Sequence, residues 1–100
     1  MAQTIEQQEI CMTSQDAIER ISACNALIET QRLLNGQPIP PKILGVYYAQ
    51  RAEAYESISD FERAIAGYER GLQFFPDTQD KIDRVKVKAS WLRLLEGHTG

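Results

Sequence analysis

Apolar residues recur every three or four positions in four stretches of the chain, a spacing that predicts four helices. The first helix is expected over about 14–34. Thr13 or Ser14 can cap its first turn, and Asp16 places negative charge at the positive end of its dipole. Gly36 suits a left-handed stop, and the prolines that follow prevent continuation. The apolar stripe of this helix comprises Ala17, Ile18, Ile21, Cys24, Leu27 and Ile28.

The second and third helices are expected over about 41–57 and 61–75. Proline suits the first position of a helix, so Pro41 begins the second helix, and Pro76 ends the third. The connection formed by Ser59 and Asp60 is very short. A connection of this length requires the two helices to lie antiparallel and side by side.

The fourth helix is expected over about 78–96, with Asp77 or Thr78 as its cap. We expect residues 1–13 to form an N-terminal arm and residues 97–100 to form a frayed tail. No alternation typical of strands is present. The sequence therefore predicts an all-α fold with about four helices in a single domain over residues 14–96.

Side-chain sizes between residues 45 and 78 follow a repeating pattern in which small residues alternate with large ones. Two helices cross closely only where side chains are small, and larger residues fill the space on either side. This segment resembles a tetratricopeptide repeat (TPR), a unit of about 34 residues formed by two antiparallel helices. The clearest departure is Arg51, where leucine is commoner. The matching positions are Tyr48, Ala52, Tyr55, Ser59-Asp60-Phe61, Ala64, Tyr68, Gly71 and Pro76.

The resemblance implies a right-handed arrangement of antiparallel helical hairpins. In that arrangement residues 45–78 are one complete repeat, and residues 14–34 are the second helix of a preceding, partial repeat. Residues 78–96 then correspond to the capping helix that follows a last repeat. An unrelated four-helix bundle remains an alternative, because it requires the same apolar stripes.

The resemblance also implies a scaffold that binds a peptide or protein along the concave face lined by the first helix of each pair. On the second helix the inward positions are Ala49, Glu53 and Glu56. The Lys and Asn residues of the familiar carboxylate clamp are missing from this face. An acidic groove favours a basic or amine-bearing ligand, although isolated surface glutamates usually serve only solubility.

The fourth helix has two apolar stripes on nearly opposite sides. Only one stripe can face the third helix. The other stripe predicts a face for a partner protein or for a homodimer centred on Trp91, because aromatic residues of this kind anchor interfaces. The alternative is that the C-terminal turns fold back under the first helix. The first stripe comprises Ile82, Val85, Ala89 and Leu92, and the second comprises Val87, Trp91, Leu94 and Leu95.

Cys11 and Cys24 leave three interpretations open: a disulfide, free thiols, or unrelated core residues. The region around them is also similar to the opening of small exported bacterial TPR proteins, which often pair such cysteines. That resemblance implies a disulfide and a periplasmic or secreted location after removal of a signal. Without the bridge, the cytoplasm is the expected location.

Charge and motif content exclude several other functions. The net charge is −3, with 14 acidic and 11 basic residues interleaved, so nucleic acid is not an expected partner. No apolar run reaches the ~20 residues that span a bilayer, so no membrane insertion is expected. The cysteines do not form a CxxC motif, and the single histidine, His98, lies in the expected tail. We therefore expect an interaction module without catalysis, metal or cofactor.

Overall fold

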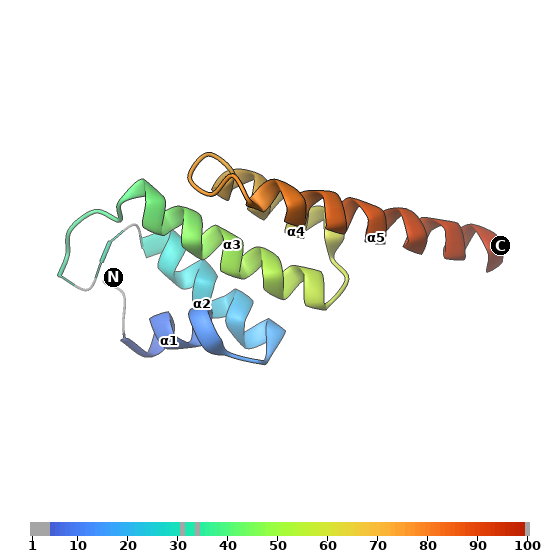
Figure 1. Cartoon of the computed structure of the whole chain (residues 1–100). Coiled ribbons are helices and arrows are strands. Elements are labelled where there is room, and N and C mark those ends of the chain that lie inside the picture. The colour runs from blue at the N-terminus through green and yellow to red at the C-terminus, as the bar shows by residue number, and fades with distance from the viewer. Residues whose placement is uncertain (1–4, 31, 34, 100) are drawn as a thin grey trace.

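The computed structural model describes residues 5–30, 32–33 and 35–99, and these residues form five α-helices (Figure 1). Within these ranges the extended structure consists of one isolated β-bridge between Arg32 and Pro38. The prediction of an all-α fold is confirmed. The helices are α1 (Ile5–Thr13), α2 (Ala17–Thr30), α3 (Pro41–Ser57), α4 (Phe61–Gly71) and α5 (Thr78–Thr99).

Helix α1 occupies most of the segment that the sequence analysis expected to be an arm. It packs against α2 and α3, and its residue Cys11 is fully buried. Tertiary contacts of this kind stabilise a short helix whose own sequence pattern is weak. Residues 1–4 of the expected arm lie outside the described residues, as do Gly100 and the side chain of His98 in the expected tail.

The start of α2 differs from the prediction because a different residue caps it. The Asp16 carboxylate accepts a hydrogen bond from the Glu19 backbone N–H at 3.1 Å. Ser14 instead accepts from the Asp16 N–H at 3.1 Å, and the Thr13 hydroxyl donates to the Glu9 carbonyl within α1. Asp16 is therefore the N-cap. Helix α2 begins at Ala17, three residues after the predicted start at Ser14.

The end of α2 also comes earlier than the expected Leu34, since the helix ends at Thr30. Gln31 and Leu34 themselves lie outside the described residues. Gly36 has a φ of 82°, so its left-handed conformation is as predicted, but it lies six residues beyond Thr30 and does not end the helix. Ile18 was expected on the buried stripe but is 66% exposed, so the buried side of α2 is narrower than predicted.

Helices α3 and α4 begin where the sequence predicts and lie antiparallel, side by side (Figure 1). The Asp60 carboxylate caps α4 by accepting from the Arg63 N–H at 3.3 Å. The helices lie very close together at Gly67, where an added Cβ would lie 3.0 Å from the Ala52 Cβ and 3.1 Å from the Tyr48 carbonyl oxygen. Small residues at this crossing set the distance between the two helices.

Helix α4 ends at Gly71, four residues before the predicted end at Phe75. The N–H groups of Phe74 and Phe75 both donate to the Gly71 carbonyl, at 3.1 and 3.0 Å. The resulting turn places the Phe74 ring against α3 at Gly45, where an added Cβ would lie 3.1 Å from the ring. The chain therefore leaves the helix before Pro76 requires it to.

Two hydrophobic clusters lie along α3, and α3 contributes to both. The first joins α1, α2 and the N-terminal half of α3. The second joins the C-terminal half of α3 to α4 and α5, and it contains Tyr68, a fully buried side chain with a large volume. The buried members of the first cluster are Cys11, Ala23, Cys24, Leu27, Ile28, Ile39 and Tyr47, and those of the second are Ala52, Ala64, Tyr68, Ile82 and Val85.

Helix α5 packs on α4 through its N-terminal half, and its C-terminal half projects beyond the other helices (Figure 1). The molecule is consequently elongated, with extents of 52 × 26 × 18 Å. The expectation that the C-terminal turns fold back under the first helix is wrong. The tail was expected to fray from Gly97, but α5 continues to Thr99.

Candidate functional site

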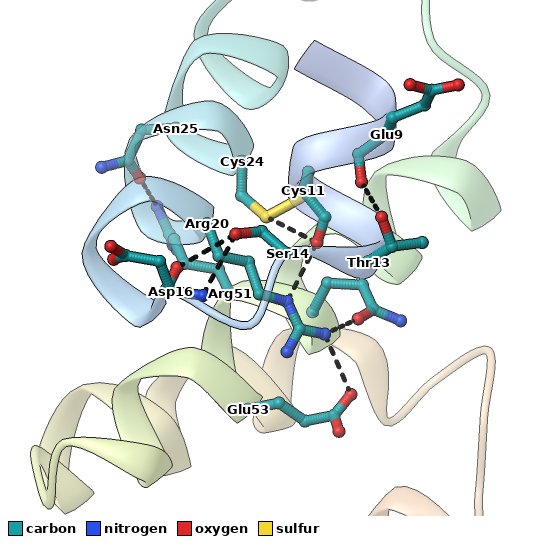
Figure 2. Close-up of a disulfide and its surroundings, with 11 residues drawn as sticks. Glu9, Cys11, Thr13, Ser14, Asp16, Arg20, Cys24, Asn25, Arg51 and Glu53 are labelled. Atoms are coloured by element: carbon teal, nitrogen blue, oxygen red, sulfur yellow. Dashed lines mark hydrogen bonds and ion pairs between the residues drawn. A yellow bond between two sulfur atoms is a disulfide. The ribbon is translucent and has the colours of Figure 1, made fainter. Parts of the chain in front are cut away.

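The disulfide that the sequence left open is present between Cys11 of α1 and Cys24 of α2 (Figure 2). The two Cα atoms lie 4.8 Å apart, and both side chains are fully buried. The interpretations as free thiols or as unrelated core residues are wrong. Because the bond joins residues 13 positions apart, it fastens α1 to the middle of α2.

Arg20 connects the disulfide region to α3. Its Nε donates to the Cys11 carbonyl at 3.0 Å, and its Nη2 donates to the Gln50 side chain. The same Nη2 lies 3.6 Å from a carboxylate oxygen of Glu53 (Figure 2). Glu53 was expected to face an open groove, but it forms an ion pair with a guanidinium group that is itself mostly buried.

Glu56 lies at the junction of α3, α4 and α5, and its side chain is only 9% exposed. It accepts a hydrogen bond from the Tyr68 hydroxyl at 2.9 Å. Arg84 approaches at 2.8 Å and Lys88 at 2.6 Å, both from α5. Two cations and a phenol therefore surround this carboxylate.

Ala49, the third expected groove residue, is half-buried on α3. The two glutamates beside it are committed to contacts within the protein, Glu53 with Arg20 and Glu56 with α5. Glu56 is withdrawn from solvent, whereas the Glu53 side chain is still 42% exposed beside Arg20. A charged partner would have to displace Arg84 and Lys88 in order to bind Glu56.

The groups around Glu56 stabilise the ionised form of its carboxyl in the folded protein. Burial alone raises the pKa of this carboxyl, but the hydrogen bonds from Arg84, Lys88 and Tyr68 outweigh burial and lower the pKa to about 2. Burial and the bond to Glu56 in turn raise the pKa of the Tyr68 hydroxyl. The bond to Glu56 also raises the pKa of Arg84.

The free energy of unfolding is expected to fall by about 2 kcal/mol as the pH drops from 5 to 2, because in that window the unfolded state binds a proton at Glu56 that the folded state does not bind until about pH 2. The unfolded carboxyl has a pKa near 4.5 and the folded one near 2, so the unfolded state binds more protons there, and stability rises with pH. Urea unfolding across this range measures the effect. Glu56→Gln should flatten the pH profile.

Glu29→Gln is the matched control, since Glu29 is exposed on α2 and makes no ion pair with the described residues. It removes the same charge, and the free energy of unfolding of this variant should still fall as the pH drops from 5 to 2. If the free energy of unfolding depended on pH in the same way in both variants, the role given to Glu56 would be contradicted.

The outer stripe of α5, which we define as Val87, Trp91, Leu94 and Leu95, is exposed to solvent. These side chains are 57, 62, 56 and 60% exposed, respectively. The stripe lies nearly opposite Ile82 and Val85, which are buried against α4. The other two members of the predicted inner stripe are less buried, since Ala89 is half-buried and Leu92 is 39% exposed. The predicted two sides of α5 therefore differ in burial only in its N-terminal half, which packs on α4.

A charged hollow that was not predicted from the sequence lies between α3 and α4. It is lined by Arg51, Tyr55, Arg63, Ala66, Gly67 and Arg70 and encloses about 280 Å³. The signal was present in the sequence, because Tyr48, Arg51 and Tyr55 follow one another at spacings of three and four on α3, and Arg63 and Arg70 are seven residues apart on α4. Only the pairing of α3 with α4 brings the two rows together.

Comparison of the chain with protein-family models, with curated proteins and with solved structures found no match in any of the three. In the part of the chain that the structure describes, no helix is long and apolar enough to cross a bilayer. The same residues contain no group of three or more His, Cys, Asp or Glu side chains placed to hold a metal ion.

Proposed function

We propose that this protein is a non-catalytic protein–protein interaction module that binds its partner through the outer stripe of α5. The observation that carries this proposal is the exposure of four large apolar side chains on one side of a projecting helix, with Trp91 at 62%. Exposed apolar patches on small soluble proteins mark interaction surfaces, and tryptophan is enriched among the residues that dominate binding energy.

The spacing within the outer stripe supports a helical partner. Val87, Trp91 and Leu94 follow one another at intervals of four and three residues, the repeat by which one helix packs along another. The partner surface is therefore an apolar helix that lies along α5.

The charges beside the outer stripe favour a different protein, rather than a second copy of this chain, as the partner. Between residues 84 and 95 the helix carries four basic residues and no acidic ones. Two of the four, Arg84 and Lys88, are paired with Glu56, whereas Lys86 and Arg93 make no ion pair with the described residues. A second copy of α5 would bring basic flanks against basic flanks, whereas a helix with acidic flanks would be attracted.

We further propose that the helices are arranged as in a TPR protein. The close crossing of Ala52 and Gly67 supports this arrangement, as does the antiparallel pairing of α3 and α4. Helix α1, which contacts both α2 and α3, then supplies the first helix of the preceding pair.

The buried disulfide supports an oxidising location, either the periplasm or the exterior of the cell.

Fluorescence titration tests the proposed partner chemistry, because Trp91 is the single tryptophan of the chain. The probes are two synthetic amphipathic helical peptides with the same leucine seam, one flanked by glutamates and the other by lysines. We expect the glutamate peptide to shift the Trp91 emission saturably and to bind at least tenfold more tightly than the lysine peptide. Equal affinities, or no binding of either peptide, would contradict the proposal.

Two measurements complete this test. Light scattering should find the isolated chain monomeric, and a dimer with Trp91 shielded from acrylamide would show that a second copy occupies the stripe. Leu94→Ala should weaken binding of the glutamate peptide by about tenfold or more, because truncation of a central contact typically costs over 1 kcal/mol. Ile18→Ala, at an exposed isoleucine on α2, should leave binding unchanged.

A further inference from the structure

Three guanidinium groups meet around the hollow between α3 and α4. Arg51 comes from α3, and Arg63 and Arg70 come from α4. Gly67 and Ala66 line the space between them and leave room that larger side chains would fill. The hollow of about 280 Å³ is large enough for a small polar group with a few attached atoms.

Tyrosine rings hold these guanidinium groups in place. The Cζ atoms of Arg51 and Arg70 each lie 5.1 Å from the centre of the Tyr48 ring. Arg63 lies 5.9 Å from the centre of the Tyr55 ring. Contacts with an aromatic face restrict a long side chain but leave its N–H groups available. The arginine side chains therefore lose less conformational entropy when a ligand binds.

The positive charge of this hollow is only partly compensated. Arg63 forms an ion pair with Asp60 at 2.6 Å. Arg51 donates to the neutral Asn25 amide at 2.7 Å, and neither Arg51 nor Arg70 has a carboxylate within ion-pair distance among the described residues. None of the six lining residues is acidic, although the whole chain has a net charge of −3.

We propose that this hollow is a binding site for an oxyanion, a carboxylate or phosphate group held chiefly by Arg51 and Arg70. The planar guanidinium presents paired N–H donors that match the oxygens of such groups. The hollow is separate from the outer stripe of α5, so this proposal does not depend on the partner proposed above. The oxyanion belongs either to a free small molecule or to an acidic side chain of a bound peptide.

A titration followed by ¹H–¹⁵N NMR at low ionic strength tests this site. The probes are inorganic phosphate and a blocked tetraglutamate peptide, with tetraglutamine as the uncharged control. We expect saturable shifts at the Arg51 and Arg70 Nε–H signals and at the Gly67 amide with at least one of the two anions. Saturation by phosphate assigns the site to free anions, and saturation by tetraglutamate alone assigns it to acidic peptides.

Variants distinguish a built site from general attraction to surface charge. Arg70→Gln should weaken binding about tenfold, and Arg70→Lys should weaken it less, because lysine keeps the charge and loses the paired donors. Arg32→Gln makes the same change in net charge at an exposed position outside both the hollow and α5, and it should bind as tightly as the original chain. Shifts that grow linearly without saturation, or equal losses in Arg70→Gln and Arg32→Gln, would overturn the proposal. Binding of tetraglutamine as tight as that of tetraglutamate would also overturn it.

Discussion

Replacement of Tyr68 by alanine is expected to lower the free energy of unfolding by about 4 kcal/mol. Tyr68 is fully buried and lies in the cluster that joins α3, α4 and α5. Truncation would remove the contacts of the ring and leave a cavity lined by neighbours such as Ala64 and Val85. It would also remove a hydrogen bond to Glu56. A loss of this size is a large part of the stability of a small domain.

Urea unfolding followed by far-ultraviolet circular dichroism measures this loss, and Tyr68→Phe separates the ring from its hydroxyl. Phenylalanine keeps the packing, while Glu56 keeps its bonds to Arg84 and Lys88. Tyr68→Phe should therefore cost only about 1 kcal/mol. If the two substitutions cost the same, the hydrogen bond rather than the packing would be the main contribution of Tyr68.

The boundaries that the sequence predicted best are those with a local physical cause. Helix α3 begins at Pro41 and α4 begins at Phe61, because proline and the Asp60 cap act on residues directly beside them. Helix α1 was missed for the opposite reason. It contacts α2 and α3, and its disulfide is made with a residue 13 positions away.

The candidate sites show the same division between local and long-range signals. The exposure of Val87 opposite the buried Val85 could be predicted from spacing on a single helix. The exposure of Trp91, Leu94 and Leu95 also depends on the projection of α5 beyond the other helices, which leaves Leu92 of the opposite stripe 39% exposed as well. The role of Glu56 could not, because its partners Arg84 and Lys88 lie 28 and 32 residues further along the chain. Arg51 departs from the TPR pattern, and the structure shows it between Asn25 and the Tyr48 ring.

Reduction of the disulfide is expected to lower the free energy of unfolding by about 3 kcal/mol. The bond restricts a loop of 13 residues in the unfolded chain, and its loss lets the unfolded state gain conformational entropy. In the folded state the bond also holds Cys11, whose carbonyl accepts the hydrogen bond from Arg20. We therefore expect α1 to lose its protection from hydrogen exchange before the α3–α4 hairpin does.

Urea unfolding with and without a reductant measures this effect, and intact mass establishes the state of the cysteines in each sample. The oxidised chain should be lighter than the reduced chain by about two hydrogens. The double variant Cys11→Ala, Cys24→Ala should unfold at similar urea concentrations with and without reductant, and it should be no more stable than the reduced chain. Equal stability of the oxidised and reduced chains would mean that packing alone holds α1 on α2. The buried sulfurs would then act as core atoms rather than as a covalent constraint.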